Sequence, residues 1–144
     1  MKKRSWIFLI LILAGIAAGY AYLQFSKTTV DIKYTRSDYV ISAEELISEF
    51  QSPEQALQKF EGKVMEVSGK ILYMQSFEND LTLSLGTAGT ATSIRCSMDT
   101  LVPVRREQLK AGDMVRIKGI CTGYNEDELL GNDISLNRCM LIKN

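Results

Sequence analysis

After Gly62 the chain alternates between apolar and polar residues, and this pattern constrains the fold more than any other feature. A period of two predicts β-strands with one buried face. Five such segments follow one another, separated by residues typical of turns and loops. Their inward positions are Val67, Gly69, Ile71, Tyr73; Leu81, Leu83, Leu85; Ile94, Cys96, Met98; Val115, Ile117, Gly119, Cys121; and Ile134, Leu136, Cys139, Leu141. The last segment keeps one face only if a residue near 137–138 bulges.

Two of these segments carry an internal glycine in the same place. The stretches GKVMEVSGKI (62–71) and GDMVRIKGIC (112–121) both have a glycine two residues after a β-branched residue, at Gly69 and Gly119. Glycine weakens a strand but permits a sharp bend. Five strands in a small domain must also hide their edges, and closing a barrel does so. We therefore expect a five-stranded barrel whose first and fourth strands bend at these glycines.

Short helices are expected before the barrel and within it. SAEELISEF begins with Ser42 as an N-cap and has Glu45 three residues later, which is a capping box. SPEQALQKF has Ser52 as the cap and Pro53 at the first helical position. The connection between the third and fourth strands is long enough for one helical turn at 104–109. The expected fold class is mainly β, with short N-terminal helices packed on the sheet.

The start of the chain predicts a transmembrane helix. MKKR precedes WIFLILILAGIAAGYAYL (6–23), which contains no charge and is near the shortest length that spans a bilayer. The positive cluster predicts a cytoplasmic N-terminus. A cleaved signal peptide is the alternative, and either way the remainder is exported. We expect a single-pass protein of the inner (cytoplasmic) membrane with its domain in the periplasm or outside the cell. Its parts are an anchor or signal segment (1–25), a stalk (26–40) and a barrel domain with leading helices (41–144).

Charge and composition limit the function classes. The net charge is +0, but Lys2, Lys3 and Arg4 are three of the 17 Lys and Arg residues, which leaves 14 against 17 Asp and Glu, or −3, for the remainder. This balance opposes strong nucleic-acid binding. The sequence has no histidine, which excludes a Ser-His-Asp triad, a Cys-His pair and histidine metal ligation. No carboxylate pair has a recognisable catalytic spacing. We expect no enzymatic activity and no cofactor.

Three strands, a helical link and two further strands form an order similar to the OB-fold. YVISAEELISEFQSPEQALQKFEGKVMEVSGKI, SIRCSMD, LKAGDMVRIKGICTGY and NRCML, over roughly residues 38–142, resemble the exported OB-fold family called tRNA-anti-like, many of whose members are proteins of Bacteroidetes. The more specific part is Gly119, Cys121 and Gly123, followed by Asn137 and Cys139. The resemblance implies an OB barrel. The family's name implies nucleic-acid binding by analogy only, because a fold does not fix a function.

The three cysteines, Cys96, Cys121 and Cys139, all fall on inward faces. They can be reduced core residues, or one pair can join in an oxidising compartment. Cys121 and Cys139 are the candidate disulfide because their strands are expected to be neighbours. A structural zinc would need a fourth ligand, and the chain has no histidine, so no metal is expected.

OB barrels usually bind ligands along the outer face of the second and third strands, framed by the loops after the first and fourth. Here those loops are MQSFEND (74–80) and YNEDELLGND (124–133). Aromatic residues near them could stack on a ligand: Tyr73, Phe77 and Tyr124. Outward cations could form a modest basic strip: Lys70, Arg95, Arg116 and Lys118. Carboxylates of the second loop would repel phosphate: Glu126, Asp127, Glu128 and Asp133. That loop could instead face a basic peptide or a cation, or be a solvated hairpin.

Two functions follow from these observations. The first is a non-enzymatic binding module of the cell envelope, attached to the membrane by its N-terminal helix, whose ligand is a protein, a peptide or a small molecule. The alternative is single-stranded nucleic-acid binding. Export and the acidic balance favour the first, whereas fold analogy and the group Tyr73, Phe77 and Arg95 favour the second.

Overall fold

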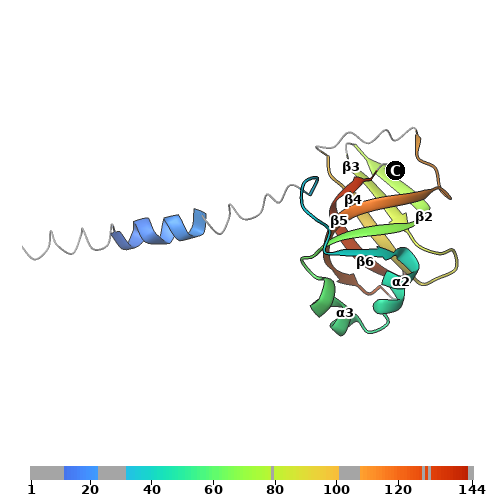
Figure 1. Ribbon diagram of the computed structural model, residues 1–144, viewed down its shortest axis with the longest axis horizontal. Coiled ribbons are helices and arrows are strands. Elements are labelled where there is room, and N and C mark those ends of the chain that lie inside the picture. Colours follow the sequence, from blue (N-terminus) through green and yellow to red (C-terminus); the bar gives the residue numbers. More distant parts are fainter. Residues whose placement is uncertain are drawn as a thin grey trace, which may run out of the picture. The chain divides into compact units, whose positions relative to one another are not determined.

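The computed structural model describes residues 12–22, 32–78, 80–100, 108–127, 129 and 131–142. The chain divides into two compact units, Met1–Asp31 and Ile32–Asn144. In the first unit, residues 12–22 are helical (Figure 1). No helix within the described residues is both long and apolar enough to cross a membrane. The transmembrane helix predicted over 6–23 is therefore not confirmed, and its other residues lie outside the described part.

The second unit contains a five-stranded barrel. Its strands are β2 (Val64–Phe77), β3 (Asp80–Leu85), β4 (Thr92–Met98), β5 (Met114–Asn125) and β6 (Asn132–Leu141). They follow the order β2-β3-β4-β6-β5, and β5 pairs back with β2, so the sheet closes. The β4–β6 pairing is parallel, and the other barrel pairings are antiparallel. The predicted barrel is confirmed, while the helical turn predicted at 104–109 falls mostly outside the described residues.

Strand β2 belongs to both halves of the barrel. Residues 64–70 pair with β5, and residues 71–77 pair with β3 apart from the bulged Leu72, so the partner changes just after Gly69. A Cβ added at Gly69 would lie 2.6 Å from the Cβ of Ala43, and one added at Gly119 would lie 2.6 Å from Sγ of Cys139. Neither glycine has a positive φ. Both positions therefore require glycine because a neighbouring residue packs against the backbone there. The sequence predicted a bend at these glycines but not this close packing.

A sixth strand, β1 (Tyr39–Ser42), pairs in parallel with β2. The segment before it also packs on the barrel. Ile32 is buried, the Asp38 carboxylate accepts a hydrogen bond from the Val64 N–H at 2.9 Å, and the Asp38 N–H donates to the Val64 carbonyl at 2.7 Å. The folded unit therefore begins at Ile32, whereas the sequence analysis assigned residues up to 40 to a stalk and started the domain at 41.

Two short helices, α2 (Ala43–Glu49) and α3 (Pro53–Phe60), lie together against the barrel (Figure 1). The predicted capping box of α2 is confirmed. Ser42 Oγ accepts from the Glu45 N–H at 3.2 Å, and the Ser42 N–H donates to the Glu45 carboxylate at 3.1 Å. The hydrogen bonds from the backbone and side chain of Ser42 lower the pKa of Glu45. At α3, Pro53 occupies the first turn as predicted, but Ser52 makes no side-chain cap bond.

The helices cover one end of the barrel, which we call the covered end. Four aromatic rings connect them to the strands there: Tyr39 and Phe60 are 5.0 Å apart, Phe60 and Phe50 6.2 Å, and Phe50 and Tyr124 5.4 Å between centroids. β3 runs from its turn with β2 towards this end. The pair formed by Phe77 and Asp80, at the other end of β2 and β3, therefore marks the opposite, hairpin end.

The bulge predicted near residues 137–138 is confirmed. Lys118 of β5 pairs with Met140, but Ile120 pairs with Asn137, so β6 holds one extra residue between these pairs. Arg138, within that stretch, has a positive φ of 54°. The extra residue restores the inward direction of Cys139, which is fully buried.

Candidate binding surface

The β2–β3 hairpin exposes three large apolar side chains. Tyr73 is 43% exposed, Met74 38% and Phe77 77%. Tyr73 and Phe77 lie on the outer face of β2, and we call these two residues the hairpin surface, whereas Met74 pairs with buried Leu83 and lies on the opposite face. A bulge at Leu72 creates the hairpin surface, because Ile71 pairs with Leu85 whereas Tyr73 already pairs with Ser84. The prediction that Tyr73 shares the inward face of the first strand is therefore wrong.

Tyr73 and Arg95 lie on one outer face. Tyr73 pairs with Ser84 across β2 and β3, and Ser84 pairs with Arg95 across β3 and β4, so the three form a row. Ser84 is 1% exposed, and its Oγ has no hydrogen-bond partner among the described residues. Sequence reasoning missed Ser84 because the alternation places it outward, where burial is not expected, and the register that sets it between a tyrosine and an arginine cannot be read from the chain.

Arg95 is held by the protein's own carboxylate. Its Nη2 lies 2.7 Å from Oδ2 of Asp133, whose side chain is 12% exposed, and Ser93 Oγ donates to the other oxygen of Asp133 at 2.7 Å. Asp133 is one of the loop carboxylates expected to repel phosphate. It instead neutralises the arginine that was expected to attract phosphate.

The other predicted cations lie over β2 and β5. The Nε of Arg116 is 3.5 Å from a carboxylate oxygen of Glu66, and Lys118 Nζ donates to the carbonyl of Thr35. Lys70 forms no ion pair or side-chain hydrogen bond with a described residue and lines a cavity of about 590 Å³ beside the start of α2. Three of the four predicted cations are thus engaged within the protein, which leaves little of the predicted basic strip free.

Tyr124 is not part of the hairpin surface. It pairs with buried Ile134 and stacks on Phe50 at the covered end, with 28° between the ring planes. Arg95 pairs with Ser135, the next residue of β6, so Tyr124 and Arg95 lie on opposite faces of the sheet. The predicted aromatic group therefore divides between the two ends of the barrel.

The three cysteines are free and buried. The predicted Cys121–Cys139 disulfide is absent, because the register pairs Cys121 with Leu136. The thiol of Cys139 instead contacts that of Cys96. This hydrogen bond, together with burial, raises the pKa of Cys139 well above its usual value, and burial raises the pKa of Cys121. Both thiols are protonated at neutral pH, which makes them poor nucleophiles and poor metal ligands.

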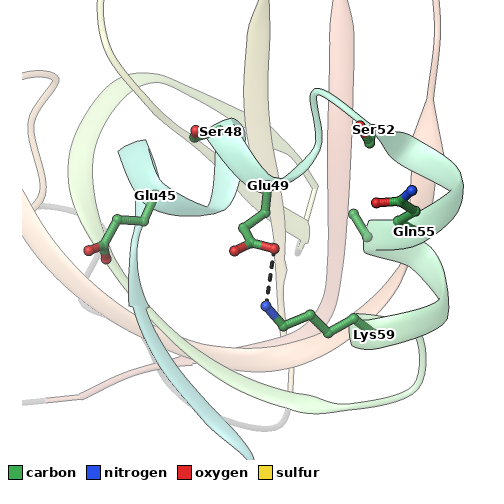
Figure 2. Close-up of a pocket in the computed structure, with 7 residues that line it drawn as sticks. Glu45, Ser48, Glu49, Ser52, Gln55 and Lys59 are labelled. Carbon is green, nitrogen blue, oxygen red and sulfur yellow. Dashed lines mark hydrogen bonds and ion pairs between the residues drawn. The ribbon is translucent and has the colours of Figure 1, made fainter.

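A polar cleft of about 510 Å³ lies between α2 and α3. Figure 2 shows Glu49 facing Lys59 across it, at 3.1 Å, while Glu45 points elsewhere. Both side chains of the pair are nearly half exposed, so the ion pair stabilises the fold by at most about 1 kcal/mol. Among the described residues, no group of three or more acidic or cysteine side chains could hold a metal ion. The cleft therefore gives no indication of a catalytic or metal-binding site.

The closed barrel, with its parallel β4–β6 pairing and helix-covered end, defines an OB-fold domain. Residues 1–135 match the profile of the tRNA_anti-like family. The chain belongs to the tRNA_anti-like family, as its glycine and cysteine pattern suggested.

The chain is similar to several solved structures at low identity. A candidate nucleic acid-binding lipoprotein from Klebsiella pneumoniae is 16% identical, with 71% of this chain and 91% of that chain covered and a TM-score of 0.49. Asparaginyl-tRNA synthetase from Pyrococcus horikoshii is 12% identical, with 59% of this chain and 21% of that chain covered and a TM-score of 0.40. A Replication Protein A heterotrimer bound to ssDNA is 9% identical, with 56% of this chain and 58% of that chain covered and a TM-score of 0.34. None of the curated proteins matches the sequence. At such identities the fold assignment rests on the strand pairing itself.

Proposed function

We propose that the protein is a non-enzymatic OB-fold binding module that holds a protein, a peptide or a small molecule at its hairpin surface. The observation that carries this proposal is the contrast on the barrel's exterior. Tyr73 and Phe77 are exposed on one face of the hairpin, whereas Arg95 is already neutralised. Neighbouring exposed apolar side chains are typical of interaction sites, and aromatic anchors supply most of the binding energy in such sites.

The proposal includes a place in the cell envelope. The positive cluster MKKR and the uncharged apolar segment 6–23 support attachment to the inner (cytoplasmic) membrane with a cytoplasmic N-terminus. The OB domain would then face the periplasm or the cell exterior. The lack of histidine and the protonated thiols Cys121 and Cys139 support a binding role rather than a catalytic one.

Single-stranded nucleic-acid binding is the second candidate, and the row Tyr73–Ser84–Arg95 favours it. A base could stack on the tyrosine while a phosphate contacts the arginine. Such a phosphate would have to displace the Asp133 carboxylate, which lies 2.7 Å from Arg95. It would also approach a chain that carries a net charge of −3 beyond its first four residues. For these two reasons we prefer the first candidate function.

The first test uses fluorescence anisotropy of the full chain in detergent with mixed-sequence single-stranded DNA and RNA at two salt concentrations. The proposal expects no saturable binding at either concentration. Micromolar binding that salt weakens, and that Tyr73→Ala and Arg95→Ala both remove, would establish the nucleic-acid function in its place.

A pull-down from envelope extract completes the test, with the full chain as bait. The captured partner should be lost with Tyr73→Ala and Phe77→Ala. The matched control is Tyr34→Ala, which removes another exposed aromatic ring, 79% exposed, from outside the hairpin. Equal capture by all baits would contradict a role for the hairpin surface.

A further inference from the structure

A second surface lies at the covered end of the barrel, away from the hairpin surface. A cavity of about 400 Å³ opens there between the α2–α3 connection and the ends of β5 and β6. Its walls include the rings of Phe50, Pro53 and Tyr124, and its polar groups include Glu126 and Asn132. Neither the family membership nor the proposed function assigns a role to this cavity.

The aromatic wall packs against buried rings of the core. Tyr124 stacks on Phe50 at 5.4 Å, and Phe50 stacks on Phe60 at 6.2 Å. Phe50 and Phe60 are buried, whereas Tyr124 is partly exposed. The core therefore fixes Tyr124 from one side while part of the residue lines the cavity. A ring held in this way loses little side-chain entropy when a ligand packs on it.

One carboxylate stands beside this ring. Glu126 follows Tyr124 by two residues, just beyond the end of β5, and both residues line the cavity. Glu126 is exposed, and its carboxylate forms no ion pair or hydrogen bond with the residues that the structure describes. The side chains that line the cavity include no lysine or arginine. The cavity therefore combines an aromatic surface with an uncompensated negative charge.

We propose that this cavity binds an arginine side chain presented by a protein partner. A guanidinium is planar, so it can stack on Tyr124 while its N–H groups donate to the Glu126 carboxylate. The side-chain carbonyls of Gln51 and Asn132, which also line the cavity, can accept the remaining N–H groups. An anionic group would be repelled by Glu126, and an apolar group would desolvate that carboxylate without compensation. The proposal uses no residue of the hairpin surface and does not rest on the proposed function.

The test is an NMR titration of the full chain with N-acetyl-L-arginine amide and, separately, with N-acetyl-L-citrulline amide. Citrulline has nearly the shape of arginine but no charge. We expect saturable shifts of the backbone amides of Tyr124, Glu126 and Asn132 with the arginine probe, and binding about fivefold weaker or more with citrulline. Equal affinity for the two probes, or arginine shifts that cluster elsewhere, would overturn the proposal.

Two variants locate the interaction. Glu126→Gln keeps the size of an exposed side chain and should weaken arginine binding about fivefold. Tyr124→Leu keeps the apolar bulk but removes the ring face, and should weaken it about threefold. The control Glu61→Gln removes an equal exposed charge outside the cavity and should change nothing, and Phe77→Ala should also bind like the wild type. Wild-type affinity for the arginine probe in Glu126→Gln would contradict the proposal. Because the probes bind away from the hairpin surface, this result would not affect the proposed function.

Discussion

The two ends of this barrel use aromatic residues in opposite ways. At the covered end, Phe50 and Phe60 are buried, and their rings connect α2 and α3 to the strands. At the hairpin end, Tyr73 is 43% and Phe77 77% exposed. The difference indicates that an aromatic residue here serves stability or binding according to the end at which it lies.

Truncation of a buried ring at the covered end should destabilise the protein most. Phe60 is fully buried and contacts Tyr39 and Phe50. Phe60→Ala should lower the free energy of unfolding by about 3–5 kcal/mol, because it removes a buried ring and leaves a cavity. Urea denaturation of the full chain, monitored by far-UV circular dichroism, measures this loss. A loss below about 1 kcal/mol would mean that the helices do not seal the core.

The next prediction concerns Gly69, where β2 changes partner between the two ends. Gly69→Ala should cost about 1–3 kcal/mol, because its Cβ would overlap that of Ala43. The double variant Ala43→Gly/Gly69→Ala moves the methyl group to the other side of the contact and should recover part of the loss. Additive losses in the double variant would show that overlap with Ala43 is not the cause. The same denaturation experiment measures each variant.

The helix that covers the barrel depends on its cap as well as on its packing. Ser42→Ala removes the oxygen that accepts the Glu45 N–H and should cost about 1 kcal/mol. Ser52→Ala is the matched control, since Ser52 stands at the start of α3 without a side-chain cap bond and should change stability little. Equal losses at both serines would show that the capping bond itself is not the source.

Sequence reasoning identified the barrel, the capping box of α2 and the bulge near Asn137 because each has a local signal: a period of two, a Ser-x-x-Glu spacing, and a break in alternation. It missed β1 and the bulge at Leu72. β1 is short and pairs with a strand far along the chain, and Leu72 continues the apolar pattern, so nothing local marks either. The contacts within the candidate site were predicted least well, because the partners of Arg95 and Cys139 depend on strand register.

The pH dependence of stability tests the same cap more finely. The folded protein holds the pKa of Glu45 below its ordinary 4.5. A carboxyl group with a lowered folded pKa stabilises the fold above its unfolded pKa, and this contribution is lost as the pH falls through the folded value. Acidification below pH 4.5 should therefore destabilise the wild type more than Glu45→Gln. The effect is small, because the group is exposed to solvent. Parallel pH slopes for both proteins in thermal melts would contradict the role of this carboxylate.

Truncation of the exposed ring at the hairpin end should change stability least. Phe77→Ala should alter the free energy of unfolding by less than about 0.5 kcal/mol, because a side chain that is 77% exposed leaves no cavity when removed. The informative quantity is the ratio to Phe60→Ala, since both replace the same residue type in one chain. If Phe77→Ala lowered the free energy of unfolding as much as Phe60→Ala, the Phe77 ring would be part of the core. It would then not be available to contact a ligand. A Phe77→Ala variant that keeps wild-type stability but loses the captured partner would separate binding from stability at the hairpin end.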